Sequence, residues 1–271
     1  MRQEAYFCTV KELDELGKNN IPRQLISHTH LIYSSPATLA FNSPGAEGFG
    51  VKRAGLAVPD SVMLIVSPGC CGRNTSVLSS MRAYQDRFYY LLMDETDIVT
   101  GRHLKKIPKA VAEICEGLKK KPSVVMICIT CVDALLGTDM ERVCHKAEEY
   151  AGVPVRPCYM YALTREGRKP PMVHVRQSVY SLLEPKKKKG NVVNLLGYFS
   201  PLTDDCELYD LLHGAGVKTI HEISRCKDYA QYQTMSEANF NLVLHPEARF
   251  AAEDFHDRLK IPYIELRRLY Q

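Results

Sequence analysis

The chain has 271 residues, of which 45% are hydrophobic, so it holds enough apolar material for two globular domains with a core in each. Its formal net charge of +4 is small and its lysines are scattered, which argues against a nucleic-acid partner. It has no apolar run of about 18 residues and no basic-then-apolar start, so we expect a cytoplasmic protein with no membrane partner.

Ten cysteines are many for such a chain. A disulfide framework is not expected, because cytosolic thiols are kept reduced. We therefore predict that a subset of the cysteines binds metal or does redox work, and that the others fill core or surface positions.

Strands and helices alternate after a proline- and glycine-rich start that predicts loops and one short helix at 10–18. The apolar runs predict strands at 62–66, 88–93, 124–129 and 153–158. Helical periodicity predicts helices through 78–84, 107–118, 135–150 and 172–183. Continuous apolar strands separated by helices are typical of a parallel sheet that is covered on both faces.

A polar break, KKKKG at Lys186–Gly190, predicts a boundary between two domains, residues 1–187 and 188–271. We interpret its lysines as a solvated linker. The second part has predicted strands at 192–199, 217–223, 241–245 and 262–266. One of its helices begins with Asp204-x-x-Glu207, which resembles a capping box, and another covers 248–259. The fold class is therefore α/β, with two Rossmann-like, doubly wound domains of parallel strands.

Two cysteine segments follow buried strands of the first domain. The first is SPGCC at 67–71, and the second is ITC at 129–131. Ligands collect at the carboxyl ends of parallel strands, and a helix N-terminus lowers the pKa of a thiol there. Both cysteine segments are therefore suited to hold a metal ligand at one edge of the sheet.

These segments belong to a longer set of motifs. SPGCCG at 67–72 is similar to a GPxGC turn, DETDIVTG at 94–101 to E-x-D-I-V-x-G, and ITCVDALLGTDM at 129–140 to TCP-x-x-L-I-G-D-D. With NLLGYFSP at 194–201 and NLVLHPEA at 241–248, the chain resembles component 1 of nitrogenase and its relatives, among them the light-independent protochlorophyllide reductases.

The resemblance implies reduction by relayed electrons. A partner P-loop ATPase with its own iron–sulfur cluster would hydrolyse MgATP and pass electrons to a cluster held by Cys70 and Cys131, with Cys71 as the alternate to Cys70. This sequence has no GxxxxGK[ST], so ATP would act only through the partner.

Two departures from the family pattern shape the expected assembly. The loop NSPGAEGFG at 42–50 lacks the family's further cysteine, so one chain offers two thiolates and two chains are needed for four. We expect a homodimer, or a pseudo-symmetric heterodimer, with an intersubunit 4Fe-4S cluster. The chain also stops where the family's third domain should begin, so that domain is absent here, and we expect either a fragment or a natural short relative whose pocket another chain completes. His245 stands where nitrogenase supplies a cofactor-ligating cysteine, and is a candidate cofactor-binding residue as ligand or proton donor.

Three functions remain open. The first hypothesis is an oxidoreductase subunit acting on an unknown reducible substrate, and the alternative is a non-catalytic scaffold that holds a metal cluster or tetrapyrrole for transfer. The third is a small-molecule-binding α/β protein unrelated in activity. Cys128 and Cys131 also form a C-x-x-C, but Cys128 lies within an apolar strand, where a buried cysteine is ordinary.

Overall fold

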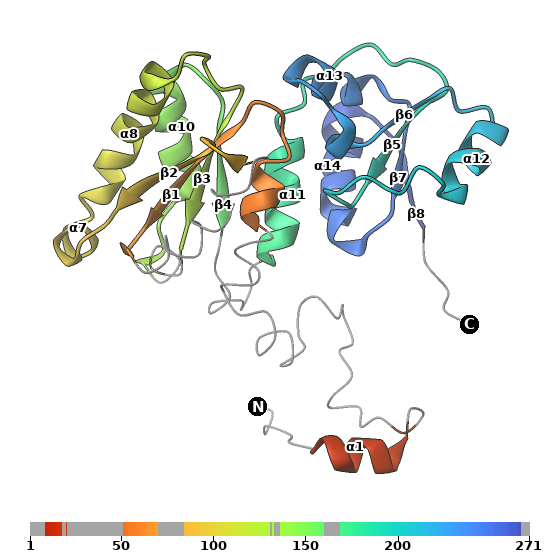
Figure 1. Cartoon of the computed structure of the whole chain (residues 1–271), viewed down its shortest axis with the longest axis horizontal. Helices are drawn as coiled ribbons and strands as arrows, with labels where there is room; N and C mark the ends of the chain where they lie inside the picture. Colours follow the sequence, from red (N-terminus) through yellow and green to blue (C-terminus); the bar gives the residue numbers. More distant parts are fainter. Residues whose placement is uncertain are drawn as a thin grey trace.

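The computed structural model describes residues 9–17, 20, 51–69, 84–130, 132, 136–159 and 169–266. Within these ranges the chain forms two four-stranded parallel sheets, each flanked by helices (Figure 1). This arrangement confirms the predicted pair of Rossmann-like α/β units. The short helix α1, Val10–Leu16, also lies where the sequence predicts one. No helix among the described residues is long and apolar enough to cross a membrane.

The first sheet has the strand order β2-β1-β3-β4. Its strands are β1 Val62–Ser67, β2 Phe88–Leu92, β3 Val125–Ile129 and β4 Val155–Tyr159. Every residue of β1 and β3 is buried, as the continuous apolar runs predict. The predicted helix through 78–84 lies almost wholly outside the described residues.

Helices cover both faces of this sheet. Leu64 and Ile127 face α8, His103–Gly117, and α10, Met140–Ala151, whereas Met63 and Met126 face α11, Pro171–Tyr180. Alternate residues of one strand thus enter two different cores, because successive side chains of a strand point to opposite faces. The short helix α7, Glu95–Thr100, follows β2.

The helix predicted at 135–150 begins later than expected. Asp139 is the N-cap of α10, and its side chain accepts a hydrogen bond from the backbone N–H of Arg142. Gly137 just before it has φ +67°, which interrupts the helical backbone. The helical spacing of apolar residues continues across Gly137, so it did not predict the break.

The second sheet has the order β6-β5-β7-β8. Its strands are β5 Val192–Leu196, β6 Thr219–His221, β7 Phe240–Val243 and β8 Tyr263–Glu265. Its helices are α12 Glu207–Gly214, α13 Tyr229–Gln233 and α14 Arg249–Leu259, with the short 3-10 helices η3 Ile223–Arg225, η4 Thr234–Glu237 and η5 Pro246–Ala248.

The predicted capping box at the start of α12 is wrong. The N-cap is Cys206, which makes no side-chain cap, and Glu207 is already the first helical residue. Asp204 instead forms an ion pair with Arg225, at 2.7 Å from Nη2. The D-x-x-E spacing was present, but a partner distant in the chain binds the aspartate.

The two units share one continuous hydrophobic core. Helices α11 and α14 lie side by side between the sheets (Figure 1). Tyr180 of α11 and Phe255 of α14 are both fully buried, and their ring centroids are 5.3 Å apart. The last helix before the lysine run is therefore packed against both units.

The last two lysines of the lysine run contact the second unit. Lys188 donates a hydrogen bond of 2.6 Å to the carbonyl of Ser236, and Lys189, although exposed, forms an ion pair with Glu237. Lys186 and Lys187 are exposed as well. The interpretation as a solvated linker thus holds for its first two lysines. The domain boundary at residue 187 stays a prediction.

Candidate functional site

Two neighbouring strands lead to the predicted cysteine ligands. Strands β1 and β3 pair in parallel with Val66 opposite Ile129, so Ser67 and Thr130, the next residues of each, lie side by side at the carboxyl edge of the sheet. Cys70, Cys71 and Cys131 lie outside the described residues. Their two segments nevertheless start from adjacent points, since neighbouring strands are only about 4.8 Å apart.

Ser67 and Thr130 both carry buried hydroxyls. Their side-chain oxygens have no hydrogen-bond partner among the described residues, although the residues are 0% and 1% exposed. Unsatisfied buried hydroxyls are uncommon because each costs free energy until an acceptor is supplied. Two such donors beside segments that carry thiols fit the binding of a group with acceptor atoms at this edge, and thiolates are the usual ligands of iron–sulfur clusters.

The C-x-x-C reading as a redox pair is not supported. Cys128 is 0% exposed and lies opposite Cys158 in the register of β3 and β4, and Cys158 is equally buried. Burial raises the pKa of the Cys158 thiol well above its ordinary value. Cys128 is therefore a core residue, as its apolar strand predicted. Among the described residues, no three His, Cys, Asp or Glu side chains gather as a metal site.

The carboxyl edge of the second sheet holds His245 against Gly197. Gly197 follows β5 with φ +137°, and a Cβ at this position would lie 2.7 Å from the backbone nitrogen of His245. Only glycine tolerates both the backbone angle and the approach. Just beyond the two strands, the N–H of Leu244 donates a hydrogen bond of 2.7 Å to the carbonyl of Leu196, which holds the segments together.

Arg176 of α11 donates hydrogen bonds to residues at this edge. Its Nε and Nη2 donate to the carbonyl of Gly197 at 3.0 and 2.6 Å, and its Nη1 donates to Glu247 Oε2 at 2.7 Å. The side chain is only 5% exposed, and burial lowers its pKa. A buried guanidinium of this kind fixes the loop after β5 and the turn after β7 in one arrangement.

His245 is held in a defined orientation. Its Nδ1 accepts a hydrogen bond of 3.3 Å from the backbone N–H of Glu247 and lies 3.6 Å from that residue's carboxylate. The ring meets Tyr198 edge-on, with centroids 5.7 Å apart. Burial lowers the pKa of His245, opposed by Glu247, so the neutral imidazole is favoured. With Nδ1 as acceptor, the proton of the neutral ring is on Nε2, which makes that atom a hydrogen-bond donor.

The sequence motifs predicted a role for His245 but not for Arg176 or Glu247. The NLVLH run marked the histidine because it ends a strand, whereas Arg176 lies inside a helix and reaches Glu247 across 71 residues. Gly197, directly after the strand, was the available signal, since an isolated glycine at a strand end indicates a close backbone approach.

Comparisons with known proteins all point to nitrogenase-related proteins. A family model described as "Nitrogenase component 1 type Oxidoreductase" matches residues 47–271. The chain is 26% identical over 217 residues to the nitrogenase iron-molybdenum cofactor biosynthesis protein NifE of Nostoc sp., covering 77% of this chain and 44% of the relative. It is 27% identical over 224 residues to the protein of that name from Rhizobium meliloti, covering 80% and 47%.

A solved structure, "Nitrogenase Cp1 at pH 6.5", is similar with a TM-score of 0.61 and 18% identity, covering 80% of this chain and 52% of the other. This likeness concerns the fold. The chain thus spans about half the length of the curated relatives and of the solved structure that it matches.

Proposed function

Because the chain belongs to the nitrogenase component 1 type oxidoreductase family, we propose that it holds a metal–sulfur cluster through Cys70 and Cys131, with Cys71 as the alternate to Cys70. The observation that carries this proposal is the pairing of β1 with β3, which starts both cysteine segments from the adjacent residues Ser67 and Thr130. When bound, such a cluster supplies one-electron redox chemistry.

Two chains would complete the ligand set. One chain brings two motif cysteines to the edge, and a 4Fe-4S cluster takes four thiolates. A two-fold axis through the site would supply the other pair from an identical chain, giving a homodimer, and a related chain would give a pseudo-symmetric heterodimer. Ser67 and Thr130 would donate hydrogen bonds to acceptor atoms at the edge, which lowers the cost of burying their hydroxyls.

We favour a scaffold that holds a metal cluster during assembly and hands it on. The NifE proteins that the chain resembles are named for cofactor biosynthesis. The geometry of His245 supports the same role, because its Nδ1 is engaged by the Glu247 backbone and its Nε2 would offer a hydrogen bond. A hydrogen bond from His245, unlike the thiolate bonds proposed for Cys70 and Cys131, would let a group bound at the second sheet leave readily.

The second candidate is an oxidoreductase subunit. The family's description as an oxidoreductase supports it, with the cluster between Cys70 and Cys131 relaying electrons to an unknown reducible substrate. Electrons would come from a P-loop ATPase iron–sulfur partner, since this sequence lacks the motif for ATP. Either role requires reduced thiols, which supports a cytoplasmic location.

The decisive experiment compares wild type with Cys131→Ala and Cys128→Ala after anaerobic purification. Iron, acid-labile sulfide and the visible and EPR spectra are measured on each. We expect a broad iron–sulfur absorption in wild type, its loss in Cys131→Ala, and its retention in Cys128→Ala, because Cys128 is a core residue. An iron-free wild type, or a full cluster on a monomer, would contradict the proposal.

A transfer assay separates the two roles. Cluster-loaded protein is mixed with a cluster-free acceptor in the absence of ATP and of a reductase, and iron on the acceptor is counted. Transfer without turnover supports the scaffold. Retention of the cluster, together with its reduction only when an ATPase partner and MgATP are present, supports the electron relay.

A further inference from the structure

A cavity of about 550 Å³ lies between the two units, away from the cysteine edge. One wall comes from residues 53–60 and 84–87, which precede β1 and β2, and the other from the segments that follow β5 and β6. Met172 at the start of α11 closes it on one side. The volume is typical of a small-molecule site, and an occupant would touch both units.

Positive charge dominates the lining. Arg53, Arg87 and Lys227 line the cavity, against a single carboxylate, Asp60. That carboxylate is already bound by Lys120, whose Nζ lies 2.8 Å from Oδ2. The cavity therefore has an excess of cations, which favours an anionic occupant.

Arg87 is the central cation of this lining. Its Nε donates to the carbonyl of Ser61 at 2.9 Å, and its Nη2 donates to Leu56 and Val58 carbonyls at 2.8 and 3.2 Å. It has no carboxylate partner among the described residues, and its Nη1 donates to none of them. Burial lowers its pKa. Its nearest charged neighbour is Asp60, which interacts with it without a direct ion pair and is itself bound by Lys120. A guanidinium fixed by neutral acceptors, with one nitrogen still free to donate, is prepared to bind an anion.

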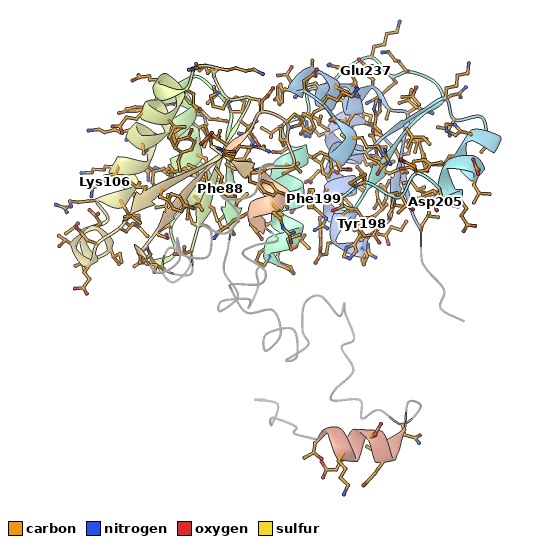
Figure 2. The ribbon with its side chains drawn as sticks, viewed as in Figure 1. Phe88, Lys106, Tyr198, Phe199, Asp205 and Glu237 are labelled. Atoms are coloured by element: carbon orange, nitrogen blue, oxygen red, sulfur yellow. The ribbon has the colours of Figure 1, made fainter. Side chains whose placement is uncertain are left out.

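Most of the other lining residues are apolar, apart from Tyr84, Ser200 and Ser224. Leu56, Met172, Phe199 and Ile223 contribute side chains, and Phe199 lies between the two units (Figure 2). The guanidinium of Arg176 lies 4.8 Å from the Phe199 ring centroid, so the ring is fixed in place. Such a wall suits the carbon body of an organic molecule more than a fully hydrated inorganic ion.

We propose that this cavity binds a small organic anion, with its carboxylate or phosphate group against Arg87 and Lys227 and its carbon body against Phe199 and Met172. Binding would join the two units, because Arg87 belongs to the first and the other charged and aromatic contacts to the second. The described residues that line the cavity include neither the proposed cluster ligands nor His245.

The test is calorimetric titration of the purified full chain at constant ionic strength with three probes: phenyl phosphate, benzoate and inorganic phosphate. We expect saturable binding of phenyl phosphate or benzoate, and weaker binding of inorganic phosphate, which lacks the carbon body. Whichever organic anion binds more tightly identifies the negative group of the ligand.

Variants locate the binding. Lys227→Glu should weaken it about ten-fold, whereas Lys218→Glu, an exposed lysine outside the cavity, should leave it unchanged. Neither substitution removes a core side chain, so the fold should persist. Absence of saturable organic-anion binding, or equal affinities for Lys227→Glu and Lys218→Glu, would overturn the proposal.

Discussion

Arg176 and Glu247 are 71 positions apart in the chain, yet Nη1 of the first lies 2.7 Å from Oε2 of the second, and their side chains are only 5% and 18% exposed. The pair connects the helix that packs on the first sheet with the turn after β7 in the second. Breaking a buried ion pair costs more than forming it contributes, because the remaining charge loses its partner.

We predict that Arg176→Met lowers the free energy of unfolding by about 3 kcal/mol, since it leaves Glu247 and the Gly197 carbonyl without their donor. Urea unfolding followed by circular dichroism measures the change. Arg142→Met, at an exposed position on α10, is the matched control and should change stability by less than about 0.5 kcal/mol. Equal effects of the two substitutions would refute the assigned role of Arg176.

Gly197→Ala should destabilise the protein more than Gly101→Ala. Both glycines have positive φ, +137° and +65°, but only at Gly197 would the added Cβ collide with backbone, that of His245 at 2.7 Å. We expect a loss of about 1 kcal/mol at Gly101 from the backbone angle alone, and at least about 2 kcal/mol at Gly197. Thermal unfolding of both variants, with an NMR spectrum of the His245 ring, checks the order.

The buried carboxylate of Asp97 predicts a pH dependence. It accepts from Lys106 Nζ at 2.6 Å and Arg102 Nε at 3.1 Å. The hydrogen bond from Lys106, followed by smaller contributions that include Arg102, lowers the pKa of Asp97. The Asp97 carboxylate therefore stabilises the folded state fully at pH values above its unfolded-state pKa of about 3.9. This stabilisation is lost as the pH falls through the lower folded-state pKa.

The Tm difference between wild type and Asp97→Asn should accordingly be large at neutral pH and shrink in strong acid. Differential scanning calorimetry from pH 7 downwards measures it. Asp205→Asn, at an exposed position near α12 (Figure 2), is the control and should show a small difference at every pH. A difference for Asp97→Asn that is constant with pH would contradict the ion-pair explanation.

Cysteine labelling should separate the core thiols from the accessible ones. Cys128 and Cys158 are both 0% exposed, so iodoacetamide should modify neither in the folded protein and both in urea. Cys206, partly exposed at the start of α12, should react without denaturant. Mass spectrometry of peptides after timed labelling reads out all three, and rapid native-state labelling of Cys128 would reopen the C-x-x-C interpretation.

The sequence predicted the strands well because the signal for each lies within the strand itself. Every residue of β3 is apolar and buried, and its order beside β1 follows from the usual parallel arrangement. The alternation after Lys186–Gly190 likewise predicted the second sheet. The motifs that follow strands of the first sheet also helped to identify the family.

Features that depend on distant partners could not be predicted. Asp204 matched the spacing of a capping box, but Arg225 binds it. The sequence did not predict that α10 begins at Met140, because Leu136 continues the helical spacing of apolar residues. Leu136 is nevertheless 51% exposed. The donors around Gly197 come from α11, and no local pattern distinguishes a buried arginine in a helix from an exposed one.

The contact of Tyr180 with Phe255 has a consequence for synthesis on the ribosome. The first sheet and α11 leave the exit tunnel well before α14, because 74 residues separate the two rings in the chain, from 181 to 254. During that interval the apolar face of α11 lacks its cover, and exposed apolar surface on a nascent chain invites aggregation. The final fold is therefore reached only after translation of α14, and a chaperone that shields α11 until then would raise the yield of native protein.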